Sequence, residues 1–291
     1  MNIEEEHGIF HELDPNSEDN QIQYRENYDK DGNLVTKEYY CNDKITSIEH
    51  YDKDSRANSK EYYGEDGKLT HKESYYYDKN GKVNSIEHYG KDSNLITKEY
   101  YYFDKRISIQ YYDKDGKVIS DKLYDENGNL TSRQHYGEGG KLTSSRSYYY
   151  NKDGNATSSK LYNYKDDKIT SIESYDKYSN LTSSKLYNEA GNLTSREIYN
   201  KDGKVTSREF YYYNRYGKLI ARAYYYCEKI TSTQSYDKDG KVISSKLYDE
   251  AGKLTSREIY NKDGKITSRV FYYYDKDGRL IPKTWKNLWR R

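Results

Sequence analysis

The chain has 291 residues, of which 40 are Tyr, 19 Gly and 2 Pro, and its 49 basic residues nearly balance 48 acidic ones. Leu, Ile, Val and Phe together contribute 45 residues, about 15% of the chain, below the roughly 20% that marks sequences able to bury a conventional core. A random coil is disfavoured too, because the net charge is only +1 and Tyr is abundant. Composition therefore predicts a thin structure held together by Tyr and regular backbone pairing.

Several classes of protein are excluded by the same arithmetic. No apolar run approaches the 18 or more residues that a membrane span needs. Near-zero net charge, spread along the chain, gives no electrostatic footprint for nucleic acid. Residues 1–20 carry seven acidic residues and no Lys or Arg, so they lack the basic region of a signal peptide. We therefore expect a cytoplasmic location by default, with signal-independent export or a surface location as the alternative.

Residues 1–23 form an acidic segment without a repeat. His7 and His11 are four apart in this segment, a spacing that on a helix places two ligands on one face. No further His or Cys cluster completes such a site, so we expect no metal there.

Residues 24–281 form a tandem repeat array. Tyr124–Tyr136, Tyr187–Tyr199 and Tyr248–Tyr260 are nearly the same segment, and each begins and ends on Tyr with a spacing of 12. Following the Tyr anchors gives roughly twenty units, grouped into about four super-repeats of about 62 residues.

Each unit predicts one strand and one turn. Lys204–Tyr211 is rich in β-branched and aromatic residues, and Asn200–Gly203 suits a type I turn that Gly extends into a three-residue loop with a G1 bulge. Because 12 is even, equivalent residues of successive units should lie on the same face of the sheet. One face should then carry Leu (or Val), Ser, Glu (or Lys) and Tyr, and the other face should carry Lys, Thr, Arg and Ile. The loop predicts these pairs: Asn200 with Lys204, Tyr199 with Val205, Ile198 with Thr206, and Glu197 with Ser207.

Each Tyr should thus lie opposite the aliphatic residue six positions later, a contact of about 0.2–1 kcal/mol. The anchors concerned are Tyr124, Tyr136, Tyr187, Tyr199, Tyr248 and Tyr260. Gly-less junctions such as Cys41–Lys44 predict two-residue loops that flip the parity. The predicted fold is all-β: a long antiparallel up-and-down meander of about twenty short strands, forming a single-layer or coiled repeat ribbon.

Residues 282–291 hold both Trp and four basic residues. One interpretation is a cap over the last exposed strand. The other is a membrane-surface or partner anchor that uses Trp285 and Trp289.

Two motifs resemble known repeat families. Tyr-Asp-x-x-Gly-x-Leu-Thr-Ser, as in Tyr124–Ser132, resembles the YD repeats of Rhs-type proteins, whose strands wind into a shell enclosing a toxin. Tyr-Tyr-Tyr-x-x-x-Gly-Lys-Leu, as in Tyr211–Leu219, is similar to the MORN-variant repeats of bacterial antitoxin or immunity proteins. The chain departs from the first family in having no toxin domain, and from the second in its Ser/Thr-Arg strand centres. Neither resemblance implies catalytic residues.

Chemistry-bearing residues are few. Asp-Lys-Asp-Gly turns such as Asp29–Gly32 favour turn chemistry over calcium binding, because no complete set of loop ligands accompanies them. Cys41 and Cys227 occupy similar Tyr-Tyr-Cys positions about fifteen strands apart, too far for a disulfide, so we expect two free, half-buried thiols.

The leading functional hypothesis is a non-enzymatic, protein-binding scaffold without a cofactor, with immunity-like neutralisation of a toxin implied by the resemblance. The alternatives are a structural or cell-surface, self-assembling or adhesive repeat protein, and carbohydrate binding through rows of Tyr. Tyr and Trp are frequent in binding hot spots. The candidate interface therefore consists of Tyr211, Tyr212, Tyr213, Tyr272, Tyr273, Tyr274, Trp285 and Trp289.

Overall fold

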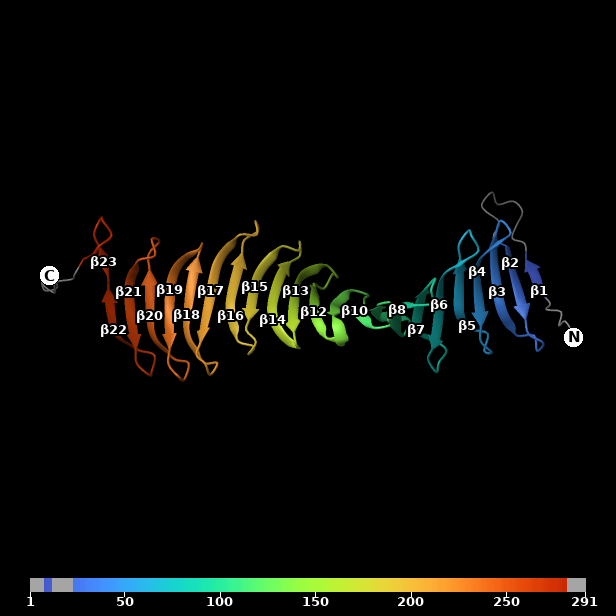
Figure 1. The fold of residues 1–291 in the computed structure, drawn as a ribbon, viewed down its shortest axis with the longest axis horizontal. Helices are drawn as coiled ribbons and strands as arrows, with labels where there is room; N and C mark the ends of the chain where they lie inside the picture. Colours follow the sequence, from blue (N-terminus) through green and yellow to red (C-terminus); the bar gives the residue numbers. More distant parts are fainter. Residues whose placement is uncertain (1–7, 12–22, 282–291) are drawn as a thin grey trace. The chain divides into compact units, whose positions relative to one another are not determined.

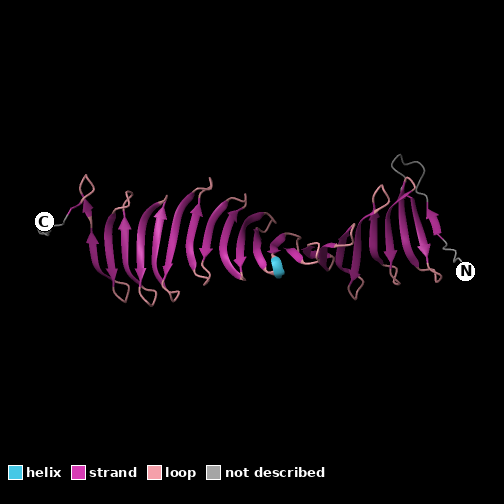
Figure 2. Cartoon of the chain, in the orientation of Figure 1, coloured by secondary structure: helices cyan, strands magenta, loops and turns pink. Residues whose placement is uncertain are grey.

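The computed structural model describes residues 8–11 and 23–281, and these are nearly all strand (Figure 2). The chain divides into two compact units, Met1–Leu142 and Thr143–Arg291. Trp285, Trp289 and the proposed C-terminal cap lie outside the described residues, as does His7. No helix in the described part is long and apolar enough to cross a membrane.

The first unit is an antiparallel meander in which each strand pairs with the next along the chain (Figure 1). A short 3₁₀ turn, Glu138–Gly140, follows its last strand. Its strands are β1 (Gly8–His11), β2 (Gln23–Tyr28), β3 (Leu34–Cys41), β4 (Lys44–Tyr51), β5 (Ala57–Tyr63), β6 (Leu69–Tyr77), β7 (Val83–Gly90), β8 (Leu95–Tyr102), β9 (Lys105–Tyr112), β10 (Val118–Tyr124) and β11 (Leu130–Tyr136).

The second unit repeats the same meander (Figure 1), except that its last two strands pair with each other in a separate two-stranded sheet. The predicted all-β antiparallel fold is thus confirmed in both units. The strands of the second unit are β12 (Leu142–Tyr150), β13 (Ala156–Lys165), β14 (Lys168–Asp176), β15 (Leu181–Tyr187), β16 (Leu193–Tyr199), β17 (Val205–Tyr213), β18 (Leu219–Tyr226), β19 (Lys229–Tyr236), β20 (Val242–Tyr248), β21 (Leu254–Tyr260), β22 (Ile266–Phe271), β23 (Tyr273–Tyr274) and β24 (Leu280–Ile281).

The predicted turns are confirmed as well. The Gly203 N–H donates to the Asn200 carbonyl at 3.0 Å, and the Asn200 N–H donates to the Lys204 carbonyl at 2.9 Å, as a type I turn with a G1 bulge requires. Gly203 takes φ 74°, a left-handed value that a side chain would strain. The two-residue loop after Cys41 places Asn42 and Asp43 at φ 51° and 59°, typical of a type I′ turn.

The register beyond the first pair differs from the prediction. Tyr199 pairs with Val205 as expected, but Ile198 pairs with Ser207 rather than Thr206, and Glu197 pairs with Arg208 rather than Ser207. A second bulge therefore follows the loop. The residue left unpaired is Thr206; Ile220 and Ile243 hold the same position in other hairpins with the same bulge, so the bulge does not require Thr. The Thr206 hydroxyl donates to the Ile198 carbonyl at 3.2 Å. The Thr of other Leu-Thr-Ser segments makes the same bond, at 3.1 Å in both β11 and β21.

The second bulge overturns the predicted parity. At each three-residue loop the faces are exchanged, so Glu197 and Tyr199 lie on one face while Glu209 and Tyr211 lie on the other. At the two-residue loop after Cys41, the change of face caused by the loop and the change caused by the bulge cancel. Even-numbered residues therefore stay on the same face across this loop, contrary to expectation. The Tyr spacing across that loop is 11 instead of 12, which preserves the alternation. Both faces of each unit therefore carry equivalent Tyr–Glu pairs on alternate strands.

Burial follows from this arrangement. Ile109 (7% exposed) and Ala223 (5% exposed) are the only buried hydrophobic residues in the described ranges. The other buried residues are serines near strand centres, over which long neighbouring side chains lie; Ser245 Oγ is 3.2 Å from the Tyr260 hydroxyl. Since neither face is predominantly apolar, a single layer needs no second sheet to cover it.

Polar clusters replace the missing core. Glu49 accepts a hydrogen bond from the Tyr51 hydroxyl at 2.7 Å and one from Lys60 Nζ at 3.0 Å. Burial by itself raises the pKa of Glu49, but these bonds outweigh it and hold the pKa below its ordinary value. Burial and the bond to Glu49 raise the pKa of Tyr51. We call this arrangement the Tyr–Glu–cation cluster; its members are Tyr28–Glu26–Lys37, Tyr51–Glu49–Lys60, Tyr63–Glu61–Lys72, Tyr89–Glu87–Lys98, Tyr199–Glu197–Arg208 and Tyr260–Glu258–Arg269.

Candidate functional site

The Tyr triplet of β17 is divided between the two faces of the sheet. Tyr211 and Tyr213 pair with Arg222 and Leu219, whereas Tyr212 pairs with Ala221 on the opposite face. We call the face of Tyr212 the first face of the second unit and that of Tyr211 its second face. The three consecutive tyrosines of this candidate interface therefore do not share one face.

On the second face, Arg222 lies at the centre of a polar and aromatic cluster, in which its buried Nε makes no hydrogen bond within the described residues. Its guanidinium carbon is 4.8 Å from the ring centroid of Tyr211 and 4.9 Å from that of Tyr224, distances of cation–π contact. Its Nη2 donates to Glu209 at 3.2 Å. Burial and the hydrogen bond to Glu209 raise the pKa of Tyr211 to about 12. These contacts join β17 to β18 within the sheet.

The first face carries a different surface. Phe210 and Tyr225 pack edge to face with ring centroids 5.6 Å apart, and Tyr212 is 49% exposed. Opposite Phe210 and Tyr212 stand Ala223 and Ala221, which replace the larger or polar residues of other strands; Ala223 is buried, so neighbouring side chains cover it. We call Phe210, Tyr212, Ala221, Ala223 and Tyr225 the aromatic strip. Tyr is one of the residue types enriched in binding hot spots.

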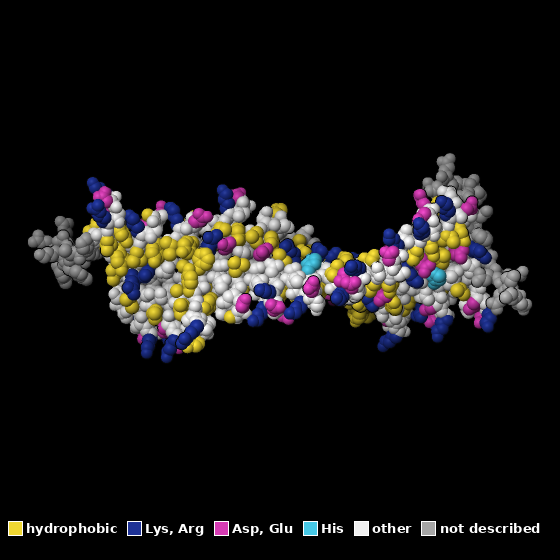
Figure 3. Space-filling view, viewed as in Figure 1, with side chains coloured by type: hydrophobic (Ala, Val, Ile, Leu, Met, Phe, Trp, Pro, Cys, Tyr) yellow, Lys and Arg dark blue, Asp and Glu magenta, His cyan; other side chains and the backbone are white. Residues whose placement is uncertain are grey.

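Sequence reasoning found only Tyr212 of this strip. The signal for the rest was present in β18, where Leu219-Ile-Ala-Arg-Ala-Tyr replaces the usual Ser-containing strand centre. Figure 3 shows hydrophobic side chains, Tyr included, gathered along the middle of the strands of this unit, with many Lys and Arg side chains at the turns.

The second predicted triplet lies elsewhere. Tyr273 and Tyr274 form β23, which five strands separate from β17, and the Tyr274 hydroxyl donates to the Leu254 carbonyl at 2.9 Å. Tyr213 makes the equivalent bond to Leu193 at 2.7 Å. The two triplets thus occupy equivalent positions in the repeat and do not meet.

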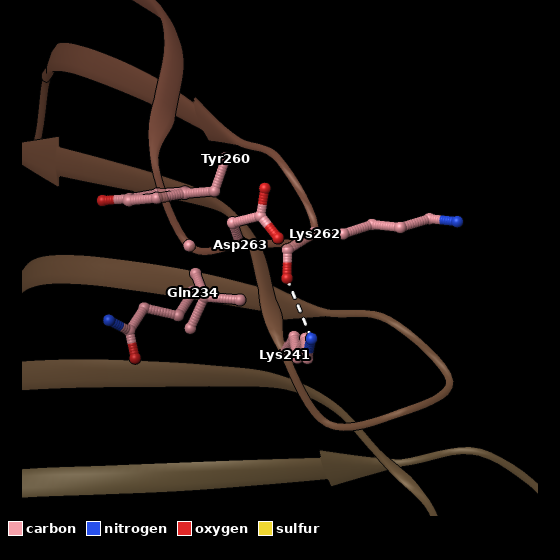
Figure 4. Close-up of a pocket in the computed structure, with 7 residues that line it drawn as sticks. Gln234, Lys241, Tyr260, Lys262 and Asp263 are labelled. Carbon is pink, nitrogen blue, oxygen red and sulfur yellow. Dashed lines mark hydrogen bonds between the residues drawn. The ribbon is translucent and has the colours of Figure 1, made fainter.

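Open grooves recur between neighbouring turns. In the second unit, a groove of about 540 Å³ lies between the turns after β19 and β21, lined by Gln234, Tyr260 and Asp263 among others (Figure 4). Lys241 Nζ donates across it to the Lys262 carbonyl at 2.9 Å. An equivalent groove of about 590 Å³ in the first unit holds Tyr40 and Tyr63. These volumes suit small ligands.

The two cysteines and the Asp-containing turns lie at strand ends and in loops. Cys41 and Cys227 are free thiols, but Cys227 is exposed rather than half-buried. The two positions are not equivalent: Cys41 ends β3, whereas Cys227 occupies the first turn position after β18 at φ 45°. The Asp29 carboxylate accepts bonds from the Asp31 and Asn33 N–H groups at 2.9 and 2.8 Å, which is turn chemistry. Within the described ranges, no group of three or more His, Cys, Asp or Glu side chains could hold a metal ion.

Comparisons with known proteins assign the chain to no family. No family model matches it, and no curated protein matches it. Similar solved structures include a mutant of S. aureus TarM in complex with fondaparinux, alpha-GlcNAc-glycerol and UDP, at 16% identity and a TM-score of 0.26, covering 35% of this chain and 20% of that one. The GtfA/B complex bound to UDP and GlcNAc matches at 15% identity and a TM-score of 0.26, covering 34% of this chain and 21% of that one.

A third structure, TcdB2-TccC3-TEV, matches at 14% identity and a TM-score of 0.21, covering 90% of this chain and 18% of that one. The chain thus spans about a fifth of the length of these structures. At such TM-scores none of the three bears on function. The resemblance to YD and MORN-variant repeats stays a likeness of motifs.

Proposed function

We propose that the protein is a non-enzymatic repeat scaffold that binds another protein through the aromatic strip. The observation that carries this proposal is the half-exposed Tyr212 ring opposite the small Ala221, on the same face as the packed Phe210–Tyr225 pair. The surrounding strands hold their polar groups in internal clusters, so the strip is the part of this face with rings free to be covered. Immunity-like neutralisation of a toxin is the specific role that the motif resemblance favours.

Measuring a defined complex tests this proposal. The chain would be co-expressed with the product of the adjacent gene, and the dissociation constant of the purified complex would be measured for wild type and Tyr212→Ala. We expect Tyr212→Ala to weaken binding at least about tenfold, the usual cost of removing a hot-spot aromatic residue.

Tyr178→Ala is the matched control, because Tyr178 is 73% exposed on a turn of the same unit. Its affinity should equal that of the wild type. Equal losses for both variants, or no change for either, would count against the aromatic strip. Protection of cells from the neighbouring gene product would support the toxin-neutralising role, and its absence would leave only the general scaffold.

A second candidate function is carbohydrate binding, which the Tyr-lined grooves favour. Tyr260 borders one groove, and Tyr40 and Tyr63 border another of similar volume. Binding on a glycan array that is lost in Tyr260→Ala and kept in Tyr212→Ala would favour this candidate over the protein-binding one.

A further inference from the structure

Three hairpins reverse the charge of the Tyr–Glu–cation cluster. In the six clusters, the residue two positions before Tyr is Glu, and a Lys or Arg stands opposite it on the next strand. In the hairpins β10–β11, β15–β16 and β20–β21, that position is Lys and the residue opposite is Arg. The resulting Lys–Arg pairs are Lys122 with Arg133, Lys185 with Arg196, and Lys246 with Arg257.

Pairing two cations in this way does not stabilise the fold, because like charges directly opposite one another on a sheet are destabilising. The side chains of Lys246 and Arg257 form no hydrogen bond or ion pair within the described residues. Their neighbours in register on adjacent strands are Thr233 and Val270, neither of which is acidic. The two cations therefore stand on this face without an acidic residue opposite them.

The Tyr of the same strand adds a third donor. In the clusters, Glu accepts a hydrogen bond from the Tyr hydroxyl two residues later, but Lys246 cannot accept one. The Tyr248 hydroxyl accordingly makes no hydrogen bond within the described part of the chain. Lys246, Arg257 and Tyr248 therefore present hydrogen-bond donors to one face with no carboxylate among them, which is the chemistry that a carboxylate or another oxyanion complements.

The position of this pair connects it to the aromatic strip. The register runs from Phe210 to Ala223, from Ala223 to Thr233, from Thr233 to Lys246 and from Lys246 to Arg257, so all five residues lie in one row on the first face. Only Thr233 separates the strip from the pair, about two strand spacings or 10 Å from Ala223 to Lys246.

A continuous polyanion does not fit the charge pattern. The other pair of this unit, Lys185–Arg196, lies on the second face, and Arg196 stands opposite Glu209. Carboxylates thus interrupt the basic residues, whereas nucleic acids and similar polymers follow a continuous positive track. Discrete carboxylates beside an apolar contact fit better.

We propose that Lys246 and Arg257, with the Tyr248 hydroxyl, bind acidic side chains of the protein partner that covers the aromatic strip. This inference rests on the proposed protein-binding function and adds the partner's chemistry: an apolar contact flanked by Asp or Glu. These charged hydrogen bonds orient the partner and speed its association, in addition to the contact that the aromatic strip makes.

Lys246→Glu is the decisive variant, because it rebuilds the Glu–Arg arrangement of the six clusters. It should leave the melting temperature unchanged or raised while weakening binding. The probe is a fluorescent oligoglutamate peptide, followed by anisotropy at low and raised salt. We expect salt-dependent binding to wild type and about tenfold weaker binding to Lys246→Glu, as for the loss of a charged hydrogen bond.

Lys262→Glu is the matched control, since it makes the same charge change on the exposed turn after β21. It should bind oligoglutamate nearly as wild type does. Equal weakening by both variants would reduce the effect to net charge and overturn the proposal, as would failure of wild type to bind. Tighter binding of tripolyphosphate than of oligoglutamate would overturn the assignment to carboxylates. Self-association at low salt that Lys246→Glu abolishes would assign the pair to a second copy instead of a separate partner.

The same variants separate this inference from the proposed function. Partner binding that is lost in Tyr212→Ala and unaffected by Lys246→Glu would contradict the inference and leave the scaffold function standing. Partner binding insensitive to both would remove the proposed surface as well.

Discussion

Removal of the Tyr199 hydroxyl, and then of its ring, dissects one Tyr–Glu–cation cluster. The hydroxyl donates to Glu197 at 2.5 Å and lies 3.2 Å from Ser184 Oγ, while Arg208 Nε donates to Glu197 at 2.6 Å. Tyr199→Phe leaves Glu197 its Arg208 partner, so we expect a loss of about 1 kcal/mol, the lower end for hydrogen bonds to charged groups because the site is half-exposed. Tyr199→Ala also removes about 100 Å² of ring contact, worth about 2 kcal/mol more.

Urea denaturation and hydrogen exchange measure the two parts of this expectation. In a repeat array each unit contacts mainly its neighbours, so exchange should accelerate in β15–β17 and stay slow in β20 and β21. Tyr178→Phe and Tyr178→Ala are the controls on an exposed turn and should change stability by less than about 0.5 kcal/mol. The reasoning would be refuted by equal losses for Phe and Ala at position 199, or by faster exchange spread evenly over all strands.

Two further predictions concern ionisation. Burial, with hydrogen bonds to Glu, raises the pKa of five tyrosines to about 12, whereas unfolded Tyr titrates near 10. Because the folded pKa is the higher one, the stability that these tyrosines contribute is present below pH 10 and is lost as the pH rises towards 12. Circular dichroism and tyrosinate absorbance should therefore change together, and tyrosines that titrate near pH 10 in an intact fold would contradict this prediction. These residues are Tyr39, Tyr40, Tyr63, Tyr101 and Tyr211. Burial also raises the pKa of Asp121, which stands between Gln110 and Gln134 with no cation opposite. Asp121→Ser should therefore stabilise the protein by about 0.5–1 kcal/mol at neutral pH. The gain should be smaller in acid, where wild-type Asp121 is protonated. Urea titrations that show the same gain in stability at both pH values would disprove this prediction.

The sequence predicts the meander because Tyr spacing and turn chemistry are local. Asn200 and Gly203 dictate their loop, and the loop dictates the pairing of Tyr199 with Val205. The second bulge was not predicted, because it leaves Thr206 unpaired on the strand that follows the loop, and the type of loop alone does not reveal it. Because such a bulge recurs at each hairpin, successive Tyr anchors lie on alternate faces instead of on one.

The candidate surface was harder to predict for the same reason. Tyr211, Tyr212 and Tyr213 are adjacent in sequence, yet strand alternation separates them. Lys246 joins the aromatic strip only through a register that runs across four strands. The charge reversal at Lys246 is visible in the sequence, but its meaning requires knowing that Arg257 stands opposite.

Cross-linking of engineered cysteines tests the alternation of the two faces most directly. In a background with Cys41 and Cys227 replaced by Ser, one double variant carries Glu197→Cys with Arg208→Cys, and the other carries Glu197→Cys with Ser207→Cys. Glu197 and Arg208 are directly opposite, whereas Ser207 pairs with Ile198 and faces the other side. Mild oxidation should therefore form a disulfide in the first variant and none in the second, since diverging Cβ vectors cannot be bridged. A disulfide in the 197–207 variant and none in the 197–208 variant would remove the second bulge, and with it the two equivalent faces and the shared row of the aromatic strip and Lys246.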